Sequence, residues 1–139
     1  FQMREDDVQR VITHPLAMIG SDGLPNDERP HPRLWGAFPR VLALYWREKG
    51  VLGLAQAIHK MTGMSAQRFR MADRGVLAAG KAADVVVFDP RTIKDNATFE
   101  NPKQVCDGIE AVWVNGVLSY TGAEGALPAR GGRFVRRAA

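Results

Sequence analysis

Residues 17–25, with the sequence AMIGSDGLP, decide how the rest of this chain is interpreted. A short apolar run leads into a Ser-Asp-Gly turn, and a polar loop rich in proline follows at 26–39. A buried strand that ends in an acidic residue and precedes a long polar loop is typical of the active-site face of an α/β barrel. A second interpretation fits as well: Asp22 ends a strand by accepting hydrogen bonds from nearby backbone amides in an Asx-type turn.

The composition is that of an ordinary globular protein with an uneven charge distribution. The chain has 139 residues, 45% of them apolar and 24% charged, which is enough for one domain with a buried core. No apolar stretch is long enough to cross a membrane. The formal net charge of +4 is matched by four arginines in the last ten residues, Arg130, Arg133, Arg136 and Arg137. We interpret them as a basic tail and expect neither nucleic acid nor a membrane as a partner, because no element interleaves basic and aromatic residues.

The single cysteine, Cys106, excludes an internal disulfide and cannot by itself form a cysteine-rich zinc site. A lone thiol is compatible with a reducing compartment, and no secretory signal follows Phe1, so we expect a cytoplasmic protein. The chain has no initiator Met and begins within an amphipathic segment. We therefore expect it to be a piece of a longer protein.

The first part of the chain predicts helices around one strand. Acidic residues in a first turn predict a helix over residues 5–12, which Pro15 ends. The apolar run 16–20 predicts a strand covered on both faces. The prolines argue against a helix within 20–39, and Pro39 suits the first position of a helix that continues through Arg47.

Two further helices are expected before residue 72. The apolar spacing of residues 51–61 predicts a helix with Gly63 just past its end as a C-cap. Ser65 is expected to cap a short helix over residues 66–71. We expect His59, on the longer helix, to face solvent or to pack against neighbours rather than to bind metal.

From residue 73 the pattern changes from helical to β. Strands are expected at 75–77 and in the valine-rich run 83–89, which Pro90 ends. Residues 109–120 predict a hairpin, because Asn115-Gly116 suits a type I′ turn between two apolar runs. Residues 92–102 and 122–132 are expected to be loops, and Phe134-Val135 a last short strand.

Few residues combine into a catalytic set. The histidines, His14, His31 and His59, lack metal-ligand spacing, and no phosphate-binding or dinucleotide-binding motif occurs. Ser21 does not lie in a nucleophile-elbow motif. The sequence thus offers one well-placed carboxylate, Asp22, and a cationic loop behind it.

Arg33 is the candidate ligand-binding residue of that loop. Its neighbours include Pro32 and Trp35, and a guanidinium held stiffly near a strand end suits bidentate binding of a carboxylate. The alternative is that Arg33 pairs with Asp27 or Glu28 and holds the loop together.

Several motifs resemble those of the N-acyl-D-amino-acid deacylases (D-aminoacylases) of the amidohydrolase superfamily. The more specific ones are GSDGLP at 20–25, HPRLWG at 31–36 and FPRVL at 38–42. A pattern shared more widely in the superfamily follows, with MT at 61–62, SA at 65–66, DRGVL at 73–77 and GKAADVVVFD at 80–89. The motifs VWVNGV at 112–117 and GGRF at 131–134 are similar to the end of these proteins. The resemblance covers nearly the whole chain.

The resemblance implies a zinc-dependent hydrolase on a (β/α)8 TIM barrel that is joined to a small β-sandwich domain. Asp22 corresponds to the aspartate on the last barrel strand, which acts as general base and then returns a proton to the leaving amine. It is also a possible zinc ligand. Arg33 falls where the family binds the α-carboxylate of the D-amino acid, and we expect Ser21 and His31 beside it in the substrate site.

The chain departs from the family in what it lacks. The histidine and cysteine zinc ligands of the family lie on earlier strands, and Cys106 does not match the metal-binding cysteine. A complete barrel needs about 250 residues. We therefore expect residues 1–72 to be the C-terminal end of the barrel, with its last strand and closing helices, and residues 73–139 to be the C-terminal part of the composite β-sandwich domain.

The expected partners follow from this fragment interpretation. They are an N-acyl-D-amino acid substrate and the missing N-terminal part of the enzyme, and self-association is expected because each half would expose apolar surface. Two alternatives remain. The chain is part of another superfamily amidohydrolase, with a cyclic amide or dipeptide as substrate, or it is a non-catalytic remnant or interaction module.

We predict that the purified 139-residue chain neither holds catalytic zinc tightly nor hydrolyses amides, because a zinc site needs three or four protein ligands. Zinc content after dialysis and turnover of N-acetyl-D-amino acids measure this. Turnover by the pure chain would contradict the prediction.

Overall fold

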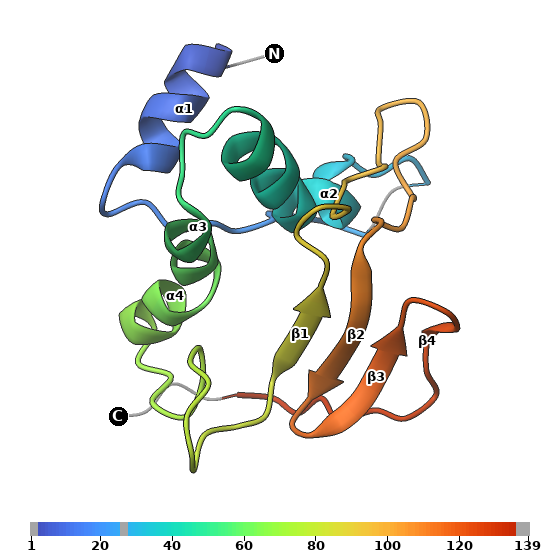
Figure 1. Ribbon diagram of the computed structural model, residues 1–139. Coiled ribbons are helices and arrows are strands. Elements are labelled where there is room, and N and C mark those ends of the chain that lie inside the picture. The colour runs from blue at the N-terminus through green and yellow to red at the C-terminus, as the bar shows by residue number, and fades with distance from the viewer. Residues whose placement is uncertain (1–2, 26–27, 136–139) are drawn as a thin grey trace.

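Helices occupy the first half of the chain and an antiparallel sheet the second (Figure 1). The computed structural model describes residues 3–25 and 28–135. The helices are α1 (Glu5–Thr13), α2 (Arg33–Arg40), the π-helix η1 (Val41–Glu48), α3 (Leu54–Met61) and α4 (Gly63–Arg68). The strands are β1 (Val85–Phe88), β2 (Ile109–Val114), β3 (Val117–Thr121) and β4 (Gly125–Ala126). They form one sheet in the order β1-β2-β3-β4.

The predicted first helix is confirmed, and its acidic first turn holds it to the next part of the fold. The Glu5 carboxylate accepts a hydrogen bond from Lys49 Nζ at 2.8 Å and one from the Tyr45 hydroxyl at 3.4 Å. Nearer the C-terminal end of α1, Ile12 is buried in the core. One helix thus combines an apolar contact with a polar one, both to the segment around η1.

The prediction of a buried strand at 16–20 is wrong for this structure. These residues form no strand, and Leu16 is 77% exposed. A strand needs at least one neighbouring strand to form its ladder of hydrogen bonds. The sheet of the described residues is built only from residues 85–126, so the segment 16–20 has no strand beside it.

The prediction that helix begins only after Pro39 is also wrong. Pro32 already has helical backbone angles (φ −57°, ψ −20°), so a proline starts α2 instead of preventing it. Pro39 lies within α2, where it lacks the N–H that would bond the carbonyl four residues earlier. The helix continues with the wider π pattern, in which the Lys49 N–H bonds the Leu44 carbonyl five residues back at 2.8 Å.

The helix α3 begins later than the sequence predicts, and α4 begins earlier. Residues 51–53 precede α3, because the N–H groups of Val51 and Leu52 bond the Tyr45 carbonyl at the end of η1. Gly63 does not end α3 as a C-cap but begins α4 after a sharp turn at Thr62. Ser65 lies within α4, and its hydroxyl donates to the Lys60 carbonyl instead of capping a helix.

The hairpin prediction is confirmed, whereas two short strands are not formed. Asn115 and Gly116 have φ values of 48° and 80°, both left-handed as a type I′ turn requires. Residues 75–77 turn against α4, since Gly75 has a φ of 83° and a Cβ there would lie 2.5 Å from that of Ala66. Residues 134–135 form no strand, and the expected loop instead contributes β4, which pairs with Tyr120 and Thr121.

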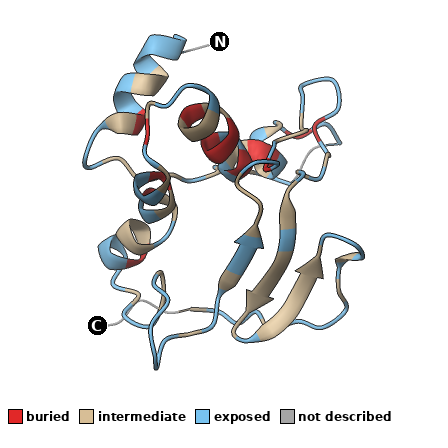
Figure 2. Ribbon diagram, in the orientation of Figure 1, coloured by how far each residue is buried: buried red, intermediate tan, exposed pale blue. Residues whose placement is uncertain are grey.

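The core lies among the helices, and the sheet is only partly covered (Figure 2). Buried side chains of η1 form one hydrophobic cluster with Ile12, Leu52, Ala57 and Ile93. Ile93 comes from the loop after β1 and is 0% exposed. Arg47 of η1 holds that loop by donating to the carbonyls of Pro90 at 3.2 Å and Ile93 at 2.7 Å.

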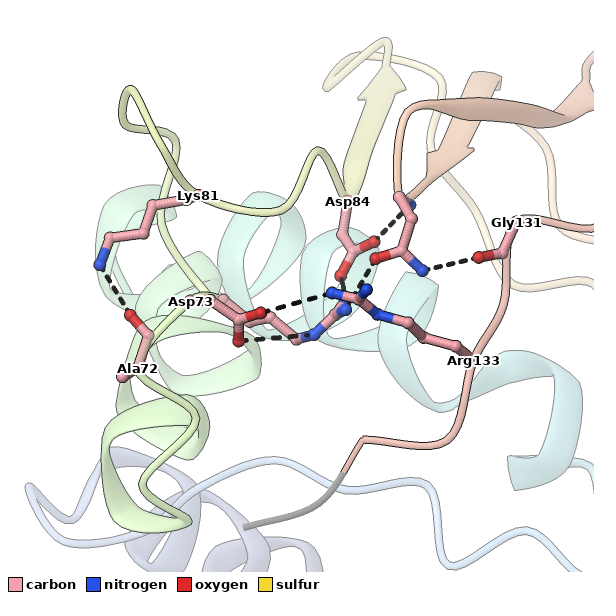
Figure 3. A network of polar contacts seen from close by, with 8 residues as sticks. Ala72, Asp73, Lys81, Asp84, Gly131 and Arg133 are labelled. Carbon is pink, nitrogen blue, oxygen red and sulfur yellow. Dashed lines mark hydrogen bonds and ion pairs between the residues drawn. The ribbon is translucent and has the colours of Figure 1, made fainter. Parts of the chain in front are cut away.

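A polar network closes the junction between the helices and the sheet (Figure 3). Arg74 forms an ion pair with Asp84 and donates to the Asn115 side chain at 2.7 Å. Asn115 in turn bonds Asp84 through its N–H at 2.8 Å and the Gly131 carbonyl through its side chain at 2.6 Å. These contacts tie the start of β1 to the hairpin turn and to the returning C-terminal segment.

None of the helices in the described part of the chain combines the length and apolar character needed to span a membrane. Large apolar side chains are exposed in both halves, among them Leu24, Val86 and Val87. Asp27, Arg136 and Arg137 lie outside the described residues.

We predict that the attachment of α1 to η1 weakens in acid. Hydrogen bonds from Lys49 and then Gln9 hold the pKa of Glu5 below its ordinary value of 4.5. This contribution to stability is present above that ordinary value and is lost as pH falls through the lower folded value. Urea midpoints measured from pH 7 to pH 3 should therefore fall more steeply for the wild-type chain than for Glu5→Gln.

The matched control is Glu124→Gln, which removes an exposed carboxylate between β3 and β4. This variant should keep the wild-type pH dependence. Parallel pH dependences for wild type and Glu5→Gln would contradict the prediction.

Candidate active site

The Ser21-Asp22-Gly23 turn packs against the start of α2. Asp22 has a φ of 48°, a left-handed conformation that aspartate tolerates better than most residues. A Cβ at Gly23 would lie 2.4 Å from Leu34 Cδ1 and 2.8 Å from Leu34 Cα, so only glycine fits there. The Gly23 N–H donates to Ser21 Oγ at 3.3 Å. The turn is therefore fixed by its own hydroxyl and by contact with the helix.

Asp22 and Arg33 meet directly in the structure. Arg33 Nη2 lies 2.8 Å from Asp22 Oδ2, and Arg33 Nε donates to the Asp22 backbone carbonyl at 2.8 Å. The Asp22 side chain is 79% exposed and the Arg33 side chain 41%. An ion pair so open to water contributes about 1 kcal/mol or less to stability. Both charges thus lie at the surface, accessible to a ligand.

The alternative interpretation of Arg33 is correct in one respect. Arg33 does hold a loop carboxylate, but the carboxylate belongs to Asp22 and not to Glu28. Asp27, the other suggested partner, is outside the described residues. The Asx-type turn is replaced by a serine turn, since the hydrogen bond within the turn ends on the Ser21 hydroxyl.

His31 faces a different part of the chain from Asp22. Its Nδ1 accepts a hydrogen bond from the Arg33 N–H at 3.1 Å, within the first turn of α2. Its ring stands edge-on to Phe99, with 5.0 Å between centroids and 80° between planes. His31 therefore connects the Arg33 backbone to a loop of the sheet half.

A groove of about 400 Å³ lies between α2 and that loop. Its lining includes His31, Arg33, Arg40, Asp95, Phe99 and Glu100. Arg40 Nη1 donates to Asp95 Oδ2 at 3.0 Å across the groove. Sequence reasoning assigned residues 92–102 only as an irregular loop. No local pattern signals the contact, because its partners are 55 positions apart in the chain.

The described residues do not form a zinc site by themselves. Among residues 3–25 and 28–135, no three His, Cys, Asp or Glu side chains gather closely enough to hold a metal ion. Zinc in proteins takes three or four such ligands. Asp22 could supply one carboxylate, and burial raises the pKa of the Cys106 thiol, which disfavours the thiolate that metals bind.

The other two histidines also lie apart from Asp22. His59 is exposed on α3, as one of the two predictions for it stated. His14 follows α1, and its Nδ1 accepts the Leu16 N–H at 3.2 Å. The structure thus brings together Ser21, Asp22 and Arg33, with His31 reaching the same helix turn from the groove side.

Comparison with known proteins assigns the class. Residues 4–120 match the Amidohydrolase family, and the chain belongs to this family. Its helices and antiparallel sheet are therefore part of an amidohydrolase-family fold. The predicted resemblance to the deacylase branch is confirmed by the relatives described next.

The relatives are enzymes named for D-amino-acid derivatives. The chain is 59% identical over 116 residues to a D-aminoacylase from Alcaligenes xylosoxydans xylosoxydans, which covers 84% of this chain and 24% of that protein. It is 50% identical over 137 residues to an N-acyl-D-glutamate deacylase from the same organism, which covers 99% of this chain and 28% of that protein. The chain thus spans about a quarter of the length of these relatives.

Solved structures agree with the sequence relatives. A crystal structure of D-aminoacylase has a TM-score of 0.88 and 50% identity, over 93% of this chain and 27% of that one. An N-acyl-D-glutamate deacylase from Bordetella bronchiseptica has a TM-score of 0.84 and 52% identity, over 89% of this chain and 27% of that one. The latter was solved with zinc and a phosphonate inhibitor that mimics the tetrahedral intermediate of the reaction.

We predict that Arg33→Lys alters the conformation of the Ser21-Asp22-Gly23 turn but lowers the free energy of unfolding only slightly. A lysine lacks the two rigidly spaced nitrogens with which the guanidinium bonds the carboxylate and the backbone carbonyl of Asp22, so it cannot keep both bonds in their present geometry. The loss of an exposed pair should lower the free energy of unfolding by about 1 kcal/mol or less, while the amide resonances of residues 21–23 shift. Denaturant titration and NMR spectra of the chain measure the two effects.

Arg47→Lys is the contrasting variant, because Arg47 bonds two carbonyls from a half-buried position. It should lower stability by more than Arg33→Lys does. A loss of several kcal/mol from Arg33→Lys would instead make the pair chiefly structural.

Proposed function

We propose that this chain is the C-terminal part of a zinc-dependent amidohydrolase that converts N-acyl-D-amino acids to a D-amino acid and a carboxylate. The observation that carries the proposal is the 50–59% identity to three relatives, all named as deacylases or aminoacylases of D-amino-acid derivatives. At this identity the chemistry of a site is usually retained together with the fold. The exposed pairing of Asp22 with Arg33 supplies the two charges that such a reaction uses.

The architecture of the complete enzyme is part of the proposal. Residues 1–72 would form the end of a (β/α)8 barrel, and residues 73–139 would form part of a composite β-sandwich. Two features support this. The segment 16–20 has its apolar side chains only half covered or exposed, and β1 lies at an edge of the sheet with Val86 and Val87 exposed. Further strands placed beside both segments would complete their backbone hydrogen bonds.

Asp22 is proposed as the general base and acid. A carboxylate can take a proton from the attacking water and then return it to the leaving amine. Its high exposure in this chain keeps the carboxylate accessible to a water molecule and to a substrate. Zinc, bound by ligands from the rest of the enzyme with Asp22 as a possible additional ligand, would supply Lewis-acid activation of the water and the amide carbonyl.

Arg33 is proposed to bind the α-carboxylate of the substrate. The bonds to Asp22 use Nε and Nη2, and the guanidinium has a second edge, Nη1 with Nη2, that matches a carboxylate. Ser21 and His31 are proposed to line the same site, since their hydrogen bonds fix the two ends of this arrangement.

A chimera tests the proposal without any knowledge of the remaining sequence. The 116 matched residues replace their counterparts in the D-aminoacylase that is 59% identical over this range. We expect a zinc-loaded chimera that hydrolyses N-acetyl-D-amino acids and not their L enantiomers. Asp22→Asn should lower kcat per bound zinc by about 10²-fold or more. Arg33→Lys should act mainly on KM.

The controls separate the alternatives. Arg91→Lys changes an exposed arginine whose ion pair, within the described residues, is with Asp89, and should leave both constants unchanged. A zinc-loaded chimera without turnover, or an Asp22→Asn chimera with full kcat, would refute the proposal. Hydrolysis of cyclic amides or dipeptides alone would favour another branch of the superfamily.

A further inference from the structure

Lys60, on α3, is the one charged residue buried among those that the structure describes. It is 2% exposed, and its Nζ donates hydrogen bonds to the backbone carbonyls of His14 at 2.5 Å and Ala17 at 2.8 Å. In the described part of the chain, no carboxylate forms an ion pair with it. The sequence gives no hint of this arrangement, since Lys60 lies in an ordinary amphipathic helix.

Burying an ammonium group without a counter-charge is unfavourable unless its N–H groups donate hydrogen bonds to buried acceptors. Lys60 uses them on two backbone carbonyls just after α1, of which that of His14 also accepts the Ala17 N–H at 3.0 Å. The His14 carbonyl lies at the C-terminal end of α1, where the helix dipole favours a cation. The Ala17 carbonyl belongs to the segment 16–20, which has no strand beside it. Lys60 therefore stabilises a stretch of backbone that has no strand beside it and only local hydrogen bonds of its own.

The backbone of Lys60 adds a third bond to the same stretch. The Ile19 N–H donates to the Lys60 carbonyl at 3.1 Å. One residue thus holds positions 14, 17 and 19 in order, as the chain leaving α1 passes α3 (Figure 1). Only Gly20 and Ser21 separate the last of these bonds from Asp22.

Asp22 is therefore held from two directions. On one side lie the three bonds to Lys60, and on the other lie Arg33 and the contact of Gly23 with Leu34. The hold from Arg33 is exposed, and a substrate carboxylate would compete for it. The bonds from Lys60 are buried, so a ligand at the surface does not compete for them directly.

We propose that Lys60 is a positioning residue for Asp22. It touches neither substrate nor metal, and it fixes the path of the backbone that presents the Asp22 carboxylate. Its catalytic consequence rests on the function proposed above, whereas its effect on the backbone does not. A displacement of about 1 Å at a reacting group lowers rates by up to about 10²-fold, so a positioning residue can matter as much as one that reacts.

Hydrogen exchange in the 139-residue chain tests the effect on the backbone. Lys60→Met keeps an unbranched apolar side chain and removes the donors. We expect the Ile19 and Gly23 amides to exchange at least tenfold faster than the loss of global stability explains. Lys60→Gln, which keeps N–H donors without the charge, serves if the methionine variant does not fold. Its Ile19 and Gly23 exchange rates should lie between those of the wild type and of Lys60→Met.

Lys81→Met is the matched control for that experiment. Lys81 Nζ also bonds a backbone carbonyl, that of Ala72 at 2.7 Å, but from an exposed position remote in the chain from Asp22. It should leave the Ile19 and Gly23 amides unchanged. Wild-type protection of Ile19 in a folded Lys60→Met or Lys60→Gln chain would overturn the proposal.

A double-mutant cycle in the deacylase chimera tests the catalytic consequence. We expect Lys60→Met to lower kcat at least tenfold with KM changed less than about twofold. In the Asp22→Asn background it should lower kcat by less than about twofold, because the residue through which Lys60 acts is gone. A merely structural role predicts the same factor in both backgrounds, and that result would overturn the catalytic part.

Leu52→Ala is the control for a general loss of stability. It weakens the core without touching the Lys60 bonds and should leave kcat per bound zinc unchanged.

The proposed function and the positioning role of Lys60 can be refuted separately. If Asp22→Asn alone leaves kcat at the wild-type value, the proposed function is wrong, and the exchange data still decide whether Lys60 holds the backbone. If Asp22→Asn strongly lowers kcat, and Lys60→Met lowers kcat by the same factor with and without Asp22→Asn, the proposed function stands and only the positioning role of Lys60 is wrong.

Discussion

The side chain of Ile93 is fully enclosed in the helical core, although it belongs to the loop that follows β1. Burying such a side chain stabilises the fold by about 1.5–3 kcal/mol. The close approach requires Gly108, which has a φ of 80° and where a Cβ would lie 2.5 Å from the Ile93 nitrogen. Arg47 then bonds the same loop from η1. The placement of the sheet beside the helices, and of Phe99 beside His31, depends on this insertion.

The elements that the sequence predicts correctly are those whose causes are local. The type I′ hairpin follows from Asn115 and Gly116 alone, and α1 follows from its acidic first turn. The start of α2 could not be predicted from the prolines, because whether a proline starts or blocks a helix depends on the residues before it. The strand predicted at 16–20 needs neighbouring strands that the described chain does not provide. Local rules fail where a partner is distant.

In the candidate site, too, the local features could be predicted from the sequence and the contacts between distant residues could not. The sequence points to Asp22 and Arg33 as residue types, because a carboxylate in a turn and a rigid arginine each suit a chemical task. It does not show that they pair, nor that Asp95 and Phe99 reach α2 from the other half. Lys60 escapes sequence reasoning altogether, since a lysine on an amphipathic helix is normally solvated. Only the fold reveals which charges are buried.

The left-handed backbone at Asp22 limits which residues this position accepts. Alanine or a branched residue would meet a steric cost of about 1–2 kcal/mol there, whereas asparagine shares the tolerance of aspartate and glycine has none of the penalty. The identity of the residue is thus constrained twice, by the reaction it serves and by the dihedral angle it occupies. An alanine at this position combines the loss of a carboxylate with a rearranged turn, and an asparagine separates the two.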